Sequence, residues 1–190
     1  MAGFRSAVMA FALGLTIASP LARAAAPPPP APLISGDFDL QTLKDRPVTL
    51  ASYRGKWVLL YFGYTSCPDT CPTVLNELGN AFTELGPKAQ RVQALFITVD
   101  PARDKKPVMI KYMKEFDPRI EGLLGDPDSI EAAAKSFHVY YRARAIGHGE
   151  YAIDHSSYLY VIDPKGHFVE LLGADVPGHK LALEIRRLIR

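Results

Sequence analysis

The chain has 190 residues, of which 48 % are hydrophobic and 22 % are charged, which predicts one soluble domain with a full core. Its formal net charge is +2 at pH 7. Removal of residues 1–26 would take away Arg5 and Arg23 and no acid, leaving 20 cationic against 20 anionic side chains. A neutral domain argues against a nucleic-acid partner, because that binding requires a clustered excess of Lys and Arg.

The N-terminal residues 1–26 have the pattern of an export signal. Arg5 supplies the positive start, residues 7–18 are apolar, and small residues near position 24 offer a cleavage site. The apolar stretch is shorter than the roughly 20 residues that span a bilayer, which favours a cleaved signal. An uncleaved membrane anchor is the alternative. The proline-rich residues 27–36 predict an extended linker. We therefore expect an exported protein in a bacterial periplasm, either soluble or tethered to the inner membrane by its N-terminus.

Residues 37–190 alternate strand-like and helix-like segments, which predicts an α/β layered domain. The expected strands are 48–50, 57–62, 92–99, 120–124, 139–143, 158–162 and 168–172, and the expected helices are 73–85, 107–116, 127–137 and 177–189. The turn Asp163–Gly166 predicts a hairpin between the last two strands. A glycine-rich phosphate loop followed by Lys is absent from the sequence, so a nucleotide-dependent function has no support.

The only two cysteines, Cys67 and Cys71, come directly after the apolar strand 57–62. Pro72 is expected to be the first residue of the next helix, where its missing N–H costs nothing. Cys71 would then lie at a helix N-terminus, which stabilises a thiolate, so we expect it to be the more acidic thiol and Cys67 the more exposed one. A purely structural disulfide is disfavoured, because three intervening residues close only a very small loop. The pair therefore predicts a site for redox chemistry or for a soft metal.

Paired cysteines at the end of the first central strand predict a thioredoxin-like fold, with a central mixed sheet flanked by helices and a C-terminal β-hairpin and helix. In that fold the loop before strand 158–162 faces the cysteine turn, so His155 could reach the thiols. Asp154 beside it could orient the imidazole or simply cap the loop. His148, on a glycine-flanked loop, could also approach the thiols. Spacing alone therefore does not decide which histidine is the third ligand. Thiolates and imidazole together suit copper and zinc.

Three segments of the sequence resemble the Sco/SenC family of copper chaperones. Residues 58–72 (Val-Leu-Leu-Tyr-Phe-Gly-Tyr-Thr-Ser-Cys-Pro-Asp-Thr-Cys-Pro) resemble its copper-site signature. Residues 96–104 (Phe-Ile-Thr-Val-Asp-Pro-Ala-Arg-Asp) resemble its second-strand segment, and residues 154–166 resemble its histidine segment. The match runs in order from about Leu33 to Arg190, which makes it far more specific than the cysteine spacing alone.

The resemblance implies a thioredoxin-like domain that binds one copper ion, as Cu(I) or Cu(II), through Cys67, Cys71 and His155. It also implies a role in assembling the binuclear CuA centre of cytochrome c oxidase. The expected partner is the CuA-bearing subunit, with another periplasmic copper chaperone or a thioredoxin-like reductant as a further partner. Tyr64, Pro68 and Asp69 are expected to shape the cysteine turn and a docking surface.

Two other functions remain open. A thiol–disulfide oxidoreductase that reduces the cysteines of the CuA subunit before metal insertion would use Cys67 and Cys71 without needing His155. The spacing argues mildly against it, because thioredoxin-like redox motifs have two intervening residues rather than three. A copper-responsive sensor would use the same three residues. A monomer is expected, because the sequence has no heptad pattern.

Overall fold

A computed structural model describes residue 34 and residues 36–189. The expected export signal and most of the expected linker lie outside the described residues, so the division at positions 26 and 36 stays a prediction. Within the described part of the chain, no helix is long and apolar enough to cross a membrane.

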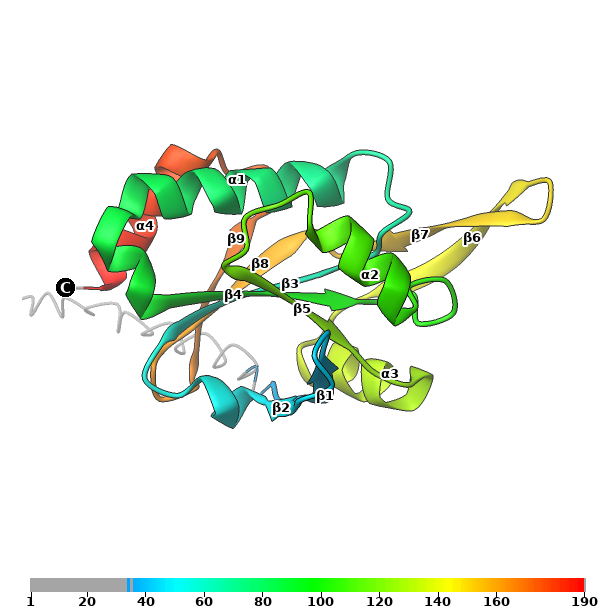
Figure 1. Ribbon diagram of the computed structural model, residues 1–190, viewed down its shortest axis with the longest axis horizontal. Helices are drawn as coiled ribbons and strands as arrows, with labels where there is room; N and C mark the ends of the chain where they lie inside the picture. The colour runs from blue at the N-terminus through cyan, green and yellow to red at the C-terminus, as the bar shows by residue number, and fades with distance from the viewer. Residues whose placement is uncertain (1–33, 35, 190) are drawn as a thin grey trace, which may run out of the picture. The chain divides into compact units, whose positions relative to one another are not determined.

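The domain is built on a seven-stranded sheet with the strand order β2-β1-β5-β4-β3-β8-β9 (Figure 1). The three central strands β3, β4 and β5 are parallel to one another, and the outer strands pair antiparallel. The buried pattern of β3 and β4 is that of strands covered on both faces. The strand bounds are β1 Asp39–Thr42, β2 Pro47–Thr49, β3 Trp57–Gly63, β4 Val92–Thr98, β5 Ile120–Leu124, β8 Tyr158–Ile162 and β9 Phe168–Gly173.

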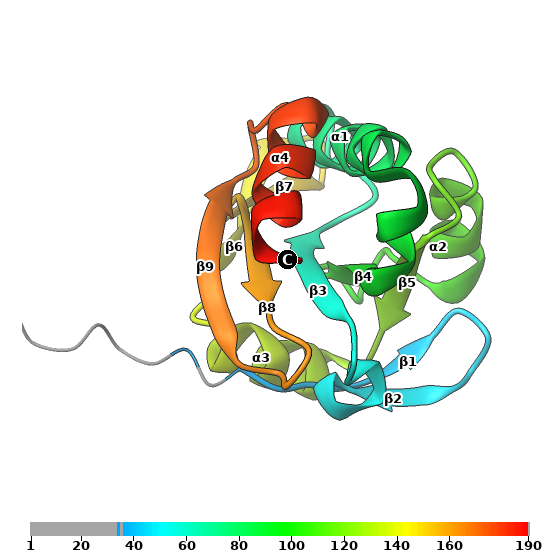
Figure 2. The ribbon, with the colours of Figure 1, turned by 90° about the vertical axis from the view of Figure 1, so that its left-hand side faces the viewer.

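Helices cover both faces of this sheet. Helices α1 and α4 lie side by side on one face and α3 lies on the other (Figures 1 and 2). The bounds are α1 Thr70–Leu85, α2 Lys106–Met113, α3 Pro127–Ser136 and α4 Gly178–Leu188, with 3₁₀ turns η1 Leu50–Tyr53 and η2 Gly86–Arg91. The predicted class is confirmed: a mixed central sheet flanked by helices, ending in the hairpin β8–β9 and a helix.

Helix α3 begins where its sequence predicts. The Asp126 carboxylate accepts a hydrogen bond from the Ser129 backbone N–H at 2.8 Å, and Pro127 occupies the first helical position. This satisfies one of the N–H groups that a helix start leaves without an intrahelical partner.

Helix α1 begins earlier than predicted. Its first residue is Thr70, with Asp69 as the N-cap, so Pro72 is the third helical residue rather than the first. Proline is tolerated there because N–H groups in the first turn have no intrahelical acceptor. Cys71 therefore lies inside the first turn of the helix, with its backbone N–H free to donate elsewhere.

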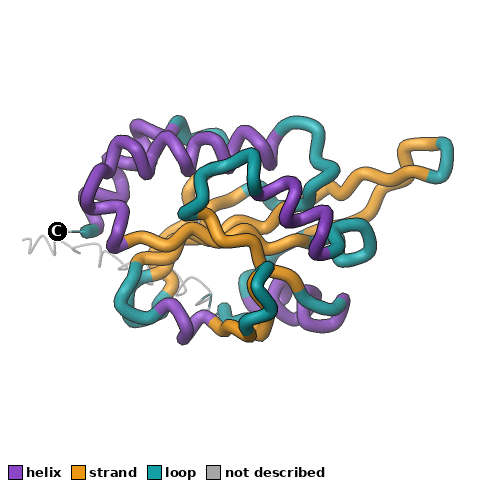
Figure 3. The backbone as a smooth tube through the Cα atoms, viewed as in Figure 1, coloured by secondary structure: helices purple, strands orange, loops and turns teal. Residues whose placement is uncertain are grey.

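A second hairpin, formed by β6 (Tyr141–Gly147) and β7 (Glu150–His155), was not predicted. Its strands pair with each other and form a separate two-stranded sheet that projects from the domain (Figures 1 and 3). The expected strand at 139–143 is thus misplaced, and His155 ends a strand rather than lying in a loop. The cause is the exposure of nearly all of β6, which removes the buried face whose alternation marks a strand. Strand β1 was also missed.

Candidate metal centre

The fold brings Cys67, Cys71 and His155 into one cluster. The two sulfur atoms and a ring nitrogen of the imidazole all lie within 4.8 Å of one another. Cys67 lies in the turn after β3, Cys71 in the first turn of α1, and His155 at the end of β7. Because metal–sulfur and metal–nitrogen bonds are about 2.0–2.3 Å long, these separations are close to the span of one ion that contacts all three atoms.

The His155 imidazole is held in a fixed tautomer and orientation. Its Nδ1 lies 3.0 Å from the Ser156 carbonyl oxygen, which can only accept, so Nδ1 carries the proton. Nε2 then directs its lone pair toward the Cys71 Sγ, 3.7 Å away. The rings of Tyr61 and Tyr64 meet the imidazole edge-on, with centroids 6.1 and 5.9 Å away. The nitrogen is therefore prepared for a metal ion, because a carbonyl partner on the second nitrogen fixes a ligating histidine.

Asp154 does not orient the imidazole, which was one of the two roles that the sequence left open for it. Its carboxylate pairs with Arg144 across the exposed hairpin at 3.0 Å, and the Ser156 carbonyl takes the orienting position instead. His148 lies at the exposed tip of the β6–β7 hairpin with a φ of 53°. Tyr64 is 3 % exposed, so it forms a wall of the cluster rather than part of a docking surface.

The two thiols have different surroundings. Cys71 is buried and Cys67 is partly exposed, which confirms the predicted difference in exposure. The Cys71 backbone N–H donates to the Cys67 Sγ at 3.4 Å, and the Tyr61 hydroxyl donates to the Cys71 Sγ at 3.8 Å. A Cβ at Gly63 would lie 2.9 Å from the Cys71 Sγ, so a glycine at this position leaves room for the sulfur.

The predicted order of thiol acidity is wrong. The hydrogen bond that the Cys71 thiol donates, supported by the one from the Cys71 backbone N–H, lowers the pKa of Cys67 to about 4. Donation of that same hydrogen bond, together with burial, raises the pKa of Cys71 above its ordinary value. The first turn of α1 does stabilise a thiolate, but the N–H that it offers, that of Cys71, points to Cys67, whereas Cys71 would have to ionise inside the protein.

This order makes a prediction for thiol alkylation. In the reduced, metal-free protein, Cys67 should react with iodoacetamide well below the ordinary thiol pKa near 8.5, because it is the thiolate that reacts. Cys71 should react slowly over the whole range between about pH 5 and 9. Mass spectrometry of the alkylated peptides measures both rates, and the denatured protein serves as the control in which the two thiols become alike. Faster alkylation of Cys71 in the folded protein would contradict the order.

A buried carboxylate fixes the cysteine turn to the end of β4. Asp104 accepts hydrogen bonds from the Thr65 backbone N–H at 3.0 Å, the Thr65 hydroxyl at 2.5 Å and the Thr98 hydroxyl at 2.6 Å. Burial raises the pKa of Asp104, and these hydrogen bonds oppose the increase. Thr65 lies two residues before Cys67, so the turn that carries the exposed thiol is attached to the central sheet.

The same loop also holds β7. The Arg103 Nε lies 2.5 Å from the Asp100 carboxylate, and its Nη1 donates to the Tyr151 carbonyl oxygen at 2.7 Å. The guanidinium lies over the Tyr151 ring at 3.7 Å, and the Tyr151 hydroxyl donates to Asp100 at 2.8 Å. Loop 100–104 therefore positions both segments that carry the cluster. The sequence pointed to this loop only by family resemblance and assigned it no role.

Comparison with known proteins decides the family. The SCO1/SenC family profile matches residues 26–190. The chain belongs to the SCO1/SenC family. Among curated members with related sequences, the mouse protein SCO2 homolog, mitochondrial, is 40 % identical over 157 residues, which cover 81 % of this chain and 62 % of the mouse protein. The human SCO2 homolog, mitochondrial, is 38 % identical over 155 residues, with 80 % and 58 % of the two chains covered. The chain thus spans about three fifths of the length of these relatives.

Solved structures of Sco proteins share the fold. ScoI of Bradyrhizobium japonicum with copper bound has 38 % sequence identity and a TM-score of 0.75, covering 80 % of this chain and 97 % of that one. ScoI of Arabidopsis thaliana with copper bound has 36 % identity and a TM-score of 0.77, covering 83 % and 98 %. These SCO1/SenC relatives confirm the predicted resemblance and the fold. Copper is the metal in both of these structures, and it suits the donor set of two thiolates and an imidazole.

Proposed function

We propose that this SCO1/SenC protein is a copper metallochaperone that binds one copper ion through Cys67, Cys71 and His155 and delivers it to the CuA site of cytochrome c oxidase. The observation that carries the proposal is the convergence of two thiols and a pre-oriented imidazole within 4.8 Å. Two thiolates favour Cu(I), and the added nitrogen ligand allows Cu(II) as well. Copper-bound Sco relatives support the choice of metal.

The surroundings of the cluster favour release as well as binding. Delivery requires that ligands of a recipient replace those of the donor one at a time, so at least one donor ligand must be accessible. Cys67 and His155 are partly exposed, whereas Cys71 is buried. A hollow of about 630 Å³ adjoins His155 and is bordered by Tyr140 and Tyr158, whose exposed fractions are 59 % and 46 %. Exposed aromatic residues beside a groove are typical of protein interfaces, and we assign this face to the recipient subunit.

Copper stoichiometry and transfer test the proposal. The reduced protein should hold one copper per chain, and the loaded protein should pass copper to a copper-free, reduced CuA domain, measured as the copper content of that domain after the two proteins are separated. Cys67→Ser should abolish the transfer, because it removes the accessible thiolate, while Ser66→Ala at the neighbouring exposed position should leave it intact. A wild-type protein that retains no copper after desalting would contradict the chaperone function.

A thiol–disulfide oxidoreductase is the second candidate, and the lowered pKa of Cys67 favours it. The Cys67 thiolate would attack a disulfide of the CuA subunit, forming a mixed disulfide and releasing one partner thiolate. The Cys71 thiol would then attack the Cys67 sulfur and give up its proton to the departing second partner sulfur, leaving a Cys67–Cys71 disulfide for a thioredoxin-like reductant to reduce. Thiol counts in a metal-free mixture with an oxidised CuA domain measure this step. Reduction of that domain by a protein that retains no copper would assign the oxidoreductase.

We also propose that the chain acts after export to a bacterial periplasm. The support is the signal-like pattern of residues 1–26 and the presence of a bacterial ScoI among the solved relatives. The curated relatives described above are mitochondrial by name. The mass of the mature protein purified from its native membrane and soluble fractions would show whether the N-terminal segment is removed.

A further inference from the structure

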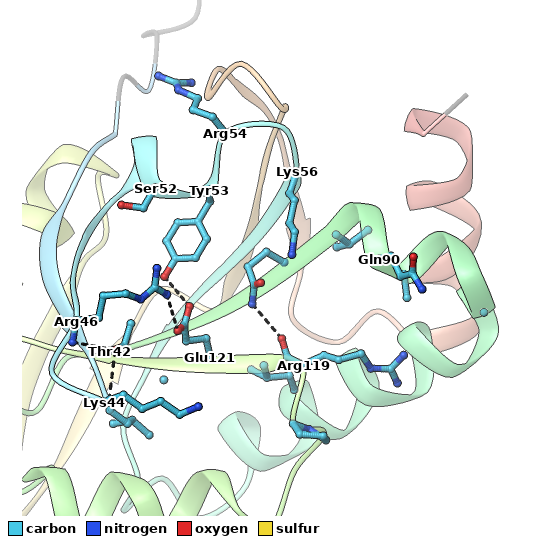
Figure 4. A pocket seen from close by; sticks show the side chains of 18 residues that line it. Thr42, Lys44, Arg46, Ser52, Tyr53, Arg54, Lys56, Gln90, Arg119 and Glu121 are labelled. Carbon is cyan, nitrogen blue, oxygen red and sulfur yellow. Dashed lines mark hydrogen bonds and ion pairs between the residues drawn. The ribbon is translucent and has the colours of Figure 1, made fainter.

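An open hollow of about 890 Å³ lies at the end of the sheet opposite the cysteines (Figure 4). It is lined by the first residues of the parallel strands β4 and β5, by the β1–β2 turn, by η1 and the residues that follow it up to Lys56, and by η2. The cysteine turn follows the other end of β3, which has seven residues and is therefore about 23 Å long. The hollow is thus separate from the candidate metal centre.

Positive charge is concentrated in this hollow. The described residues as a whole are close to neutral, with 19 Lys and Arg against 20 Asp and Glu. The hollow nevertheless has five cationic side chains and a single carboxylate in its lining, namely Lys44, Arg46, Arg54, Lys56, Arg119 and Glu121. A concave surface lined by one sign of charge focuses the field and raises the local concentration of ions of the opposite sign.

The carboxylates in and beside the hollow already pair with other side chains. Glu121 accepts hydrogen bonds from Arg46 at 3.1 Å and from the Tyr53 hydroxyl at 2.7 Å. Burial and this hydrogen bond raise the pKa of Tyr53, so its hydroxyl remains a donor. Arg119 pairs with Asp117 at 2.5 Å. No salt bridge joins Lys44, Arg54 or Lys56 to an acid among the described residues; the uncompensated charge of the hollow comes from these three.

Two of these cations are directed into the hollow. Figure 4 shows Lys44 and Lys56 extending toward it from different elements, whereas Arg54 points outward. Their backbones are anchored, because the Lys44 N–H donates to the Thr42 hydroxyl at 3.3 Å and the Lys56 N–H donates to the Tyr53 carbonyl at 3.2 Å. Each ammonium group offers three donors and a full charge to an anionic ligand.

We propose that this hollow binds a phosphate-bearing anion, either a soluble phosphate compound or the headgroup of an anionic phospholipid. Several cations around one concavity favour a ligand with more than one negative charge and several acceptor oxygens, which a phosphate group provides. The volume lies within the range of small-ligand sites. Binding here leaves Cys67, Cys71 and His155 free, so this site goes beyond copper handling.

Titration of the full chain with inorganic pyrophosphate, followed by NMR, tests the proposal. Saturable shifts are expected at the amides of Lys44 and Lys56. The double variant Lys44→Gln with Lys56→Gln should bind about 10- to 100-fold more weakly, because charge contacts of this kind contribute about a factor of three to ten each. The matched control is Lys114→Gln with Lys180→Gln, which removes the same charge from exposed positions outside the hollow. Absence of saturable shifts, or equal loss in the two double variants, would overturn the proposal.

Sedimentation with phosphatidylcholine vesicles, with and without phosphatidylglycerol, separates the two sources of phosphate. Capture that requires phosphatidylglycerol, is lost in the Lys44 and Lys56 variant and is retained in the control assigns the lipid headgroup. Pyrophosphate binding without such capture assigns a soluble phosphate compound. Copper content of the same variants should equal that of the wild type, so the proposal and the copper function fail independently.

Discussion

Replacement of His155 by alanine is expected to weaken Cu(II) binding at least on the order of a hundredfold and to change Cu(I) binding by less than about tenfold. The two thiolates of Cys67 and Cys71 satisfy the low coordination number that Cu(I) accepts, whereas Cu(II) prefers additional nitrogen or oxygen ligands. Residues that only orient a ligand commonly contribute 10- to 100-fold in metal affinity, so loss of a direct ligand should cost at least as much.

Competition with a chromogenic Cu(I) chelator measures the Cu(I) affinity, and titration of the thiolate-to-Cu(II) absorption band measures the Cu(II) affinity. His179→Ala is the matched control, because His179 is exposed in α4 and is outside the metal-ligand cluster. Equal weakening of Cu(I) and Cu(II) binding in the His155 variant, with an unchanged melting temperature, would contradict the assigned role of the imidazole.

The position of the thiols was predictable from local sequence. An apolar run long enough for a buried strand, followed by two cysteines and a proline, defines a strand–turn–helix unit without tertiary information. The relation of His155 to the thiols depended on the fold, because 84 residues separate His155 from Cys71 along the chain. It could be inferred only after the order of strands and helices had suggested which loop faces the cysteine turn.

The order of acidity of the two thiols and the contacts that hold the cluster in place could not be predicted from the sequence. Which sulfur accepts the N–H of the first helical turn depends on whether α1 begins at Thr70 or Pro72, and helix ends are uncertain by one or two residues in any pattern. Tyr151 lies in a hairpin whose exposed strand β6 gives no alternating pattern. Its contact with Arg103 joins segments 48 residues apart, so only the folded chain reveals it.

Loosening of the contact between Arg103 and Tyr151 is expected to displace β7 and so to weaken Cu(II) binding by about 10- to 100-fold. This range is typical of groups that orient a metal ligand. Tyr151 precedes His155 by four residues on this strand, and the Tyr64 hydroxyl, which accepts from the Ile153 N–H at 3.3 Å, is a further attachment of β7. Arg103→Lys keeps the charge beside Asp100 but loses the stacking and the fork geometry of the guanidinium. Cu(I) binding should change little, because both thiolates lie outside the hairpin.

Arg103→Lys and Tyr151→Phe should both lower the stability of the fold by moderate amounts. Tyr151→Phe removes a hydrogen bond to the buried Asp100 carboxylate, and a bond to a charged group contributes about 1.5–3 kcal/mol. Arg103 has a side chain that is 30 % exposed, so Arg103→Lys should cost less than the roughly 3–5 kcal/mol of breaking a fully buried pair. Thermal unfolding of the metal-free protein measures both losses.

Hydrogen exchange separates a positioning role from a purely structural one. If loop 100–104 holds the imidazole in place, the β7 amides should exchange faster in Arg103→Lys and Tyr151→Phe, and Cu(II) affinity should fall in parallel. Arg144→Lys is the control, because Arg144 pairs with Asp154 on the same hairpin but both side chains are more than half exposed, and such pairs contribute at most about 1 kcal/mol. A lower melting temperature with unchanged β7 exchange and unchanged Cu(II) affinity would show that the contact stabilises the fold without positioning the histidine.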